Sequence, residues 1–196
     1  KRARKSLSLF GDTKQQMNSH GSNIKDIAEG LDSKQMSLDY NYRLPKAIAK
    51  VAQQIIGGGV DLMSNNQKDG GNSDYPNYPK PIITQYANPE KELEGILTRI
   101  QMEDLGDVAI LVPSDKEVMM VNDYLANHGI KTQVMYRTGN TVPFRTVNTL
   151  DFSNNDLPCI LTYYAAKGSE FDNVFVPFAN TSNDCSRNSF YVACTR

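Results

Sequence analysis

The triplet Asn41-Tyr42-Arg43 places an aromatic ring beside a guanidinium group, just after a short predicted strand. A tyrosine ring can stack on a base, and an arginine can form paired hydrogen bonds to a phosphate. Together the two side chains could clamp a nucleotide. Taken alone, the triplet is explained more simply as an exposed Tyr-Arg pair ahead of a helix.

The motif AAKGSEF also follows a predicted strand and contains residues suited to a phosphorylated ligand. Gly168 allows a tight turn and a close approach of the backbone to a ligand. Glu170 could accept hydrogen bonds from ribose hydroxyls, while Lys167 could contact a phosphate or form an ion pair. Near the start of the chain, Gln15 could position a water molecule or touch a terminal phosphate. Each of these signals is weak by itself.

These motifs lie in a chain whose predicted strands and helices alternate. Strands are expected at residues 6–10, 36–38, 81–87, 107–113, 130–136, 158–164 and 173–178. Helices are expected at residues 24–31, 45–56, 88–104, 115–129 and 187–196. The alternation predicts an α/β fold with a mostly parallel sheet and helices on both faces. Ligands of such sheets bind at the carboxyl ends of the strands, so we expect the motifs to meet at one edge.

Local signals add expectations about individual elements. Asn88 is expected to cap the helix that follows it, with Pro89 in the first turn, and Ser114 to cap the next helix. Residues 61–80 are rich in Gly, Asn, Ser, Asp and Pro, which predicts a flexible loop. Residues 137–156 are expected to be irregular.

The composition is that of one globular domain of 196 residues, with 39% hydrophobic and 22% charged residues. A net charge of -1 gives no overall attraction to nucleic acid, so any nucleic-acid contact needs local patches. The 3 cysteines show no CxxC spacing, which argues against a disulfide framework or a zinc site. No run approaches the ~20 apolar residues of a membrane helix, and no signal peptide is expected, so we expect a cytoplasmic protein without a membrane partner.

Four motifs occur in an order that resembles one protein family. GDTKQQ, NYRLPKAIAKVA, LTYYAAKGSEFDNVFVP and FYVACTR are similar to motifs three to six of the second motor domain of UvrD/Rep-type superfamily 1 DNA helicases. In that family the motifs read GDxxQ, NYR, TxHSAKGLEF and YVALTR. The resemblance runs from Gly11 to Arg196. It implies that residues 1–196 are a single RecA-like three-layer sandwich, with residues 1–21 as the edge that carries the third motif.

The resemblance also implies roles in ATP hydrolysis. Gln15 would sense the γ-phosphate or the attacking water, while Arg43 and Arg196 would both reach the γ-phosphate. Such arginines stabilise charge that develops in the transition state of phosphoryl transfer. The nucleotide-binding residues would be Tyr42 on the adenine, Arg43, Gly168, Glu170 and Arg196.

For single-stranded DNA the resemblance is weaker. Thr162 and Tyr164 match positions of the fifth motif that face the strand, and His20 stands where the family usually places a stacking aromatic. A surface histidine without a role is an equally good interpretation of His20. The family's tyrosine in the third motif is Asn18 here, and the leucine of the fifth motif is Ser169. The ATP-facing positions are therefore kept better than the DNA-facing ones.

Two elements of a complete ATP site are missing from the sequence. It contains neither a GxxxxGK[ST] phosphate loop nor an acidic pair that would hold Mg²⁺, and no metal site is expected in this chain. ATP phosphates and Mg²⁺ would be held by a first motor domain, so the chain alone should lack ATPase activity. We expect that the polypeptide was cut from a longer one at Arg196. UvrD/Rep-type helicases carry a large accessory insertion between the fourth and fifth motifs, and only residues 137–156 are available for it here. The chain therefore resembles compact members of the family that lack the insertion.

Three hypotheses remain open from the sequence. The first is the second motor domain of an ATP-dependent DNA helicase or translocase, with DNA repair as the family-level pathway. The second is a helicase-like binding module without unwinding activity. The third is an α/β domain in which the motifs occur by chance. A phosphate loop and an acidic DExx element upstream of Lys1 would distinguish the first hypothesis from the second.

Overall fold

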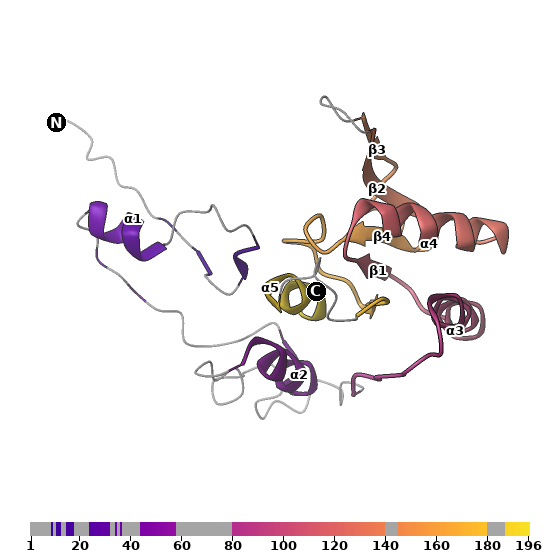
Figure 1. The fold of residues 1–196 in the computed structure, drawn as a ribbon, viewed down its shortest axis with the longest axis horizontal. Helices are drawn as coiled ribbons and strands as arrows, with labels where there is room; N and C mark the ends of the chain where they lie inside the picture. The colour runs from indigo at the N-terminus through magenta and orange to yellow at the C-terminus, as the bar shows by residue number, and fades with distance from the viewer. Residues whose placement is uncertain are drawn as a thin grey trace.

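The computed structural model describes residues 9, 11–12, 15–17, 24–31, 34, 36, 44–57, 80–139, 145–179 and 187–196. Within them the helices are α1 (Ile24–Gly30), α2 (Lys46–Ile56), α3 (Pro89–Met102), α4 (Asp115–Asn127) and α5 (Arg187–Cys194). The strands are β1 (Val108–Val112), β2 (Gln133–Thr138), β3 (Arg145–Asn148), β4 (Cys159–Thr162) and β5 (Asn173–Phe175). Figure 1 shows their arrangement.

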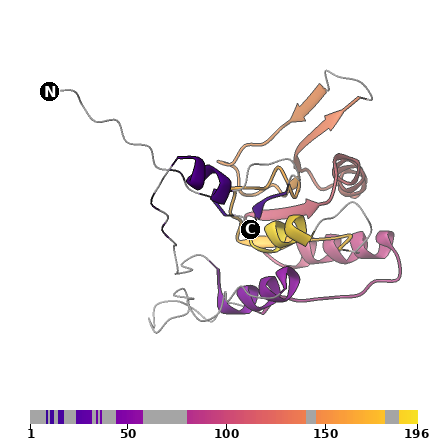
Figure 2. The ribbon, with the colours of Figure 1, turned by 60° about the vertical axis from the view of Figure 1, so that its left-hand side comes forward.

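The five strands form one mostly parallel sheet in the order β3-β2-β4-β1-β5. β4 is the central strand, and β1 lies between β4 and β5 and pairs in parallel with both. β2 runs parallel to β4, whereas β3 is antiparallel to β2. β4 contacts only the first two residues of β2, so the rest of β2 and β3 project from the body as a hairpin (Figures 1 and 2). The predicted α/β fold of the RecA-like type is confirmed.

Side chains of β1 alternate between two apolar layers, because successive residues of a strand point to opposite faces. Val108, Ile110 and Val112 pack with α3 and α4 in one core cluster. Ala109 and Leu111 pack on the other face with Ala193 of α5. A third cluster joins α5 to α2, which lie side by side in both views. Helices therefore cover both faces of the sheet, and α5 lies between the sheet and α2.

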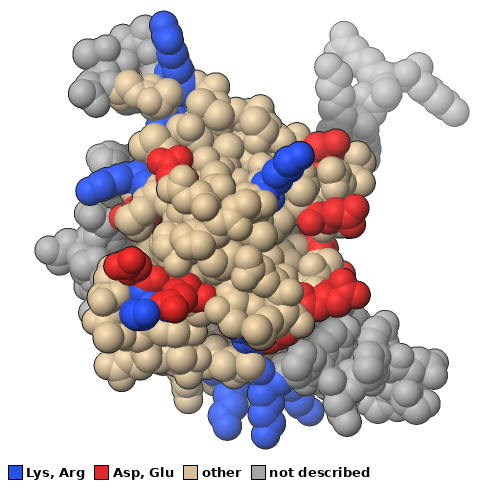
Figure 3. Space-filling view, turned by 90° about the vertical axis from the view of Figure 1, so that its right-hand side faces the viewer, with Lys and Arg blue, Asp and Glu red and all other residues tan. Residues whose placement is uncertain are grey.

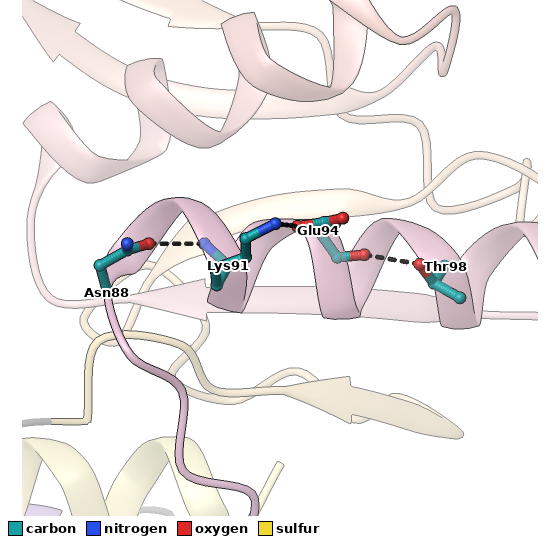
Figure 4. A network of polar contacts seen from close by, with 4 residues as sticks. All are labelled: Asn88, Lys91, Glu94 and Thr98. Atoms are coloured by element: carbon teal, nitrogen blue, oxygen red, sulfur yellow. Dashed lines mark hydrogen bonds and ion pairs between the residues drawn. The ribbon is translucent and has the colours of Figure 1, made fainter.

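The amino terminus of α3 follows the prediction made from its sequence. The Asn88 side chain accepts a hydrogen bond from the Lys91 N–H at 2.9 Å, and Pro89 occupies the first turn. Further along, the Lys91 ammonium donates to the Glu94 carboxylate, and the Thr98 hydroxyl donates to the Glu94 carbonyl at 2.8 Å (Figure 4). These contacts hold one exposed side of the helix, while its opposite side is buried against the sheet.

Replacing Asn88 with alanine should lower the free energy of unfolding by about 1 kcal/mol, because an N–H of the first turn loses its acceptor. Urea denaturation of this chain measures the change. Asn127→Ala, at the exposed last residue of α4, is the matched control and should alter the stability by less than about 0.5 kcal/mol. Equal losses in the two variants would contradict the capping role.

The prediction of a strand at residues 81–87 is wrong. Residues 81–86 belong to no strand, and Ile82 and Ile83 are 68% and 85% exposed. The apolar run identifies an extended segment, but a strand also needs a neighbour to pair with, and none of the described strands takes that place. The segment is anchored at its end, where the Tyr86 hydroxyl lies against Gly95 of α3.

The prediction that residues 137–156 are irregular is also wrong in part, because β3 lies within them. Most residues of β3 are exposed, so the strand shows no alternation of apolar and polar residues that would reveal it. Ser114 does precede α4 as predicted, but its hydroxyl donates to the Glu117 carboxylate instead of accepting a backbone N–H.

Some predicted elements lie largely outside the described residues. Leu9 and Met36, which the structure does describe, lie in no strand. The remaining positions of the strands predicted at 6–10 and 36–38 are not among the described residues, and neither is the loop predicted at 61–80 except for its last residue. No helix in the described ranges is both long and apolar enough to cross a membrane.

Phe178, just after β5, is tied to α3. Phe178 has a positive φ of 58°, which is unusual for a residue with a side chain, and its N–H donates to the Glu92 carboxylate at 3.1 Å. Partial burial raises the pKa of Glu92, and the hydrogen bond from Phe178 opposes that rise. This contact ties the residues that directly follow β5 to α3.

Charged side chains are interspersed on the face that Figure 3 shows. Seen from the side on which α3 lies in Figure 1, basic and acidic groups surround a largely uncharged area. Acidic groups follow the right-hand edge of this face, and several basic side chains lie together at its lower edge (Figure 3).

Candidate functional site

The chain makes one helical turn as it leaves the carboxyl end of β4. The Thr162 hydroxyl accepts a hydrogen bond from the Ala165 N–H at 3.1 Å, and the Thr162 carbonyl accepts one from the Ala166 N–H at 3.0 Å. Gly168 follows with φ of 93°, and an added Cβ would meet no atom within 4 Å. The backbone conformation, and not a lack of space, therefore favours glycine at this position. Because Thr162 shapes the turn, it has a structural role whether or not it contacts DNA.

The two tyrosines of this turn point in opposite directions. Tyr163 is buried against the sheet, and its ring centroid lies 6.5 Å from that of Phe190 in α5. Tyr164 is 54% exposed, so its ring is accessible to a stacking partner. Glu170 is exposed a few residues further along. The turn thus combines an inner side that packs on the core with an outer side that can meet a ligand.

The segment around Gln15 lies beside this turn. The Gln15 carboxamide nitrogen donates to the Asp12 carboxylate at 2.9 Å, and the Gln15 N–H donates to the Asp12 carbonyl at 3.2 Å. The Lys167 ammonium donates to the Gln15 carbonyl at 3.2 Å, across 152 positions of sequence. Met17 packs against both clusters that contain residues of α5. The third and fifth motifs are therefore neighbours in space.

Arg196 lies just beyond the carboxyl end of α5. Its Nε donates to the Val192 carbonyl at 3.0 Å, and its Nη2 donates to the Thr195 hydroxyl at 3.2 Å. Thr195 is buried, and its hydroxyl donates to carbonyls of the same helix turn. Carbonyl groups at the carboxyl end of a helix favour a nearby cation. The last turn of α5 therefore holds the Arg196 guanidinium group through its Nε and Nη2 atoms.

Core packing brings the turn after β4 and α5 together. Ala166 of the turn and Ala193 of α5 belong to one buried cluster on the sheet. The Asn188 amide of α5 donates to the Gln16 carbonyl at 2.9 Å. Three separate segments, which carry Gln15, Glu170 and Arg196, are thus connected by direct contacts. The contact from Asn188 is made by the first turn of α5, whereas Arg196 follows its last turn.

The structure describes part of the predicted site. The predicted residues that it describes are Gln15, Thr162, Tyr164, Gly168, Glu170 and Arg196. The predicted residues His20, Tyr42 and Arg43 lie outside the described residues. Leu44, which directly follows Arg43 in the sequence, is buried in the cluster between α2 and α5. In the described ranges, no group of His, Cys, Asp and Glu side chains could hold a metal ion.

Sequence reasoning missed two features of the site. Asn188 was not singled out, because an asparagine in the first turn of a helix has no pattern that reveals a distant carbonyl partner. Lys167 was expected to contact a phosphate or form an ion pair, whereas in this structure its ammonium donates to the Gln15 carbonyl. The family motif could identify the lysine but not its partner within the chain.

Comparison with known proteins supports the resemblance in the region where the site is best described. Residues 158–196 match the family model of the UvrD-like helicase C-terminal domain. The matched segment contains β4, the turn that follows it, β5 and α5. No curated protein matches the chain. The match confirms the resemblance recognised from the motifs: residues 158–196, which carry the last two motifs, are similar to the UvrD-like helicase C-terminal domain.

Proposed function

We propose that this chain is the second motor domain of an ATP-dependent DNA helicase or translocase, and that it supplies one wall of the ATP site. The observation that supports this most strongly is the direct contact among three segments that carry motif residues. Gln15, Glu170 and Arg196 come from positions far apart in the sequence, and the family match covers the latter two. In our proposal the three residues contact a common ligand at the edge of the sheet where the strands end.

In the proposed site, Arg196 and Arg43 neutralise charge on the γ-phosphate as the bond to it breaks. Gln15 holds the attacking water or the γ-phosphate, and Tyr42 stacks on the adenine. Gly168 and Glu170 lie against the sugar and phosphates. Electrostatic stabilisation of this kind acts most strongly when the charged groups are positioned before the reaction begins. The bonds that hold the Arg196 side chain against α5 support such positioning.

A β-phosphate and Mg²⁺ are expected to need a phosphate loop and an acidic pair, and the sequence shows neither motif. The sequence has no phosphate loop, and the described residues contain no cluster that could ligate a metal ion. We therefore assign Mg²⁺ to a first motor domain that faces this one. Closure of the two domains on ATP would bring Arg43 and Arg196 onto the γ-phosphate and so couple hydrolysis to domain movement.

The proposed track for single-stranded DNA uses the outer side of the turn after β4. Tyr164 is exposed there, and a base that stacks on an aromatic ring contributes about 1–3 kcal/mol to binding. Thr162 and His20 are the other proposed contacts. The cytoplasm and DNA repair are the setting that we expect for such a motor.

An ATPase assay tests the proposal. The purified chain alone should not hydrolyse ATP, because it provides only one wall of the site. A protein that joins the chain to a first motor domain should hydrolyse ATP, and single-stranded DNA should stimulate the reaction. Turnover by the isolated chain, free of contaminating enzyme, would contradict the half-site model. DNA binding by the joined protein without ATP-dependent unwinding would instead support a binding module.

A further inference from the structure

The backbone around Gln15 is held by side chains from two distant elements. Gln15 belongs to no described α-helix or β-strand, so no ladder of backbone hydrogen bonds fixes it. Instead, the Lys167 ammonium donates to the Gln15 carbonyl at 3.2 Å, and the Asn188 amide donates to the Gln16 carbonyl at 2.9 Å. One donor comes from the turn after β4 and the other from the first turn of α5. The next residue, Met17, packs into the core between them.

We infer that Lys167 and Asn188 are positioning residues that fix the backbone at Gln15 and so place its carboxamide in the site. Bonds to two consecutive carbonyls restrain both the location and the tilt of the peptide units between them. The inference rests on the proposed function, since that function brings Gln15 to the γ-phosphate or the attacking water. It gives Lys167 a partner within the chain, the Gln15 carbonyl, whereas the sequence suggested a contact with a phosphate or an ion pair.

The positions of the two donors also connect the three motif segments. Lys167 directly precedes Gly168, whose turn continues to Glu170, and Asn188 lies in the first turn of α5, the helix that ends just before Arg196. A shift of either segment is therefore transmitted to the Gln15 backbone through one hydrogen bond. Gln15 would follow movements of the turn and of α5 during the hydrolysis cycle.

The bond from Lys167 should matter more for catalysis than for stability. Lys167 is exposed, and a bond from an exposed side chain adds little to the free energy of unfolding. Displacement of a catalytic group by a fraction of an ångström, in contrast, can slow a reaction strongly. A positioning role therefore predicts a lower kcat with little change in KM or in stability.

The test uses Lys167→Met and Asn188→Asp in the protein that contains both motor domains. Each substitution removes the N–H donor at nearly constant size, and each should lower the kcat of ATP hydrolysis about tenfold. Lys167→Arg keeps a donor and should recover most of the rate. The matched controls on α4 are Lys116→Met and Asn127→Asp, which should stay within about twofold of the unmodified protein.

A double-variant comparison separates positioning from general damage. If Asn188 acts through Gln15, Asn188→Asp should lower kcat in the unmodified protein but not in the Gln15→Ala background. A purely structural role would lower kcat by the same factor in both backgrounds, which would overturn the inference. Hydrogen exchange of this chain gives a readout that needs no ATP: peptides that cover residues 12–17 should exchange faster in both donor variants than in the controls.

The outcomes distinguish the inference from the function on which it rests. If both donor variants keep normal kcat and normal exchange while Gln15→Ala is slow, the positioning role is wrong and the proposed function stands. If Gln15→Ala and Arg196→Ala both keep normal kcat, the proposed function itself is contradicted, and the positioning role falls with it.

Discussion

Arg196→Ala should slow ATP hydrolysis by about 10³–10⁵-fold in the protein that contains both motor domains, because a transition-state arginine contributes on that scale. The affinity for ATP should change little, since the interaction strengthens only as charge develops on the γ-phosphate. Single-turnover kinetics and a nucleotide titration measure the two quantities separately.

The same helix provides the matched control for this substitution. Arg187 begins α5 and is exposed, so Arg187→Ala removes the same kind of side chain at the end of the helix opposite to Arg196. Its rate should stay close to that of the unmodified protein. Arg196→Lys keeps the positive charge but loses the planar guanidinium group. Its rate of ATP hydrolysis should lie between the rates of Arg196→Ala and Arg187→Ala. If Arg196→Ala slows hydrolysis no more than Arg187→Ala does, the role assigned to Arg196 is wrong.

Tyr42→Ala should weaken the binding of ATP by about tenfold to a hundredfold, because stacking on a base contributes about 1–3 kcal/mol. The rate at saturating ATP should change much less. Tyr42→Phe retains the ring and should bind ATP almost normally. A titration with a fluorescent ATP analogue measures these affinities.

A tyrosine in another part of the proposed site gives the control. Tyr164→Ala should leave ATP affinity unchanged and weaken the binding of single-stranded DNA, since Tyr164 is exposed on the proposed DNA side of the turn. If Tyr42→Ala and Tyr164→Ala reduce ATP affinity equally, or if neither reduces it, the assignment of Tyr42 to the adenine is contradicted.

Much of the central sheet and its helices could be predicted because each element carries its own local signal. The five residues of β1 are all buried and apolar, and Asn88 with Pro89 marks the start of α3. β3 and the segment at residues 81–86 were predicted wrongly for a shared reason. Whether an extended segment pairs with a neighbour depends on the whole fold, and local sequence does not contain that information.

In the candidate site, too, some features could be predicted from the sequence and others depend on the whole fold. The motif letters predicted that Gln15 and the turn after β4 would meet, and the bond from Lys167 to the Gln15 carbonyl agrees with this. The contact between Asn188 and the Gln16 carbonyl could not be predicted, because it depends on how α5 packs beside residues 15–17. Sequence motifs thus identify which segments meet, whereas the atoms that connect them emerge only from the packed fold.

The central claim is that one nucleotide is contacted by Gln15, Glu170 and Arg196 together. Its most direct test is a crystal structure of the protein with both motor domains, bound to Mg²⁺ and a non-hydrolysable ATP analogue. We predict that the Arg196 guanidinium and the Gln15 carboxamide lie within hydrogen-bond distance of γ-phosphate oxygens or of the water beside them, with Glu170 at the ribose. A nucleotide bound with no contact from any of these three residues would contradict the account.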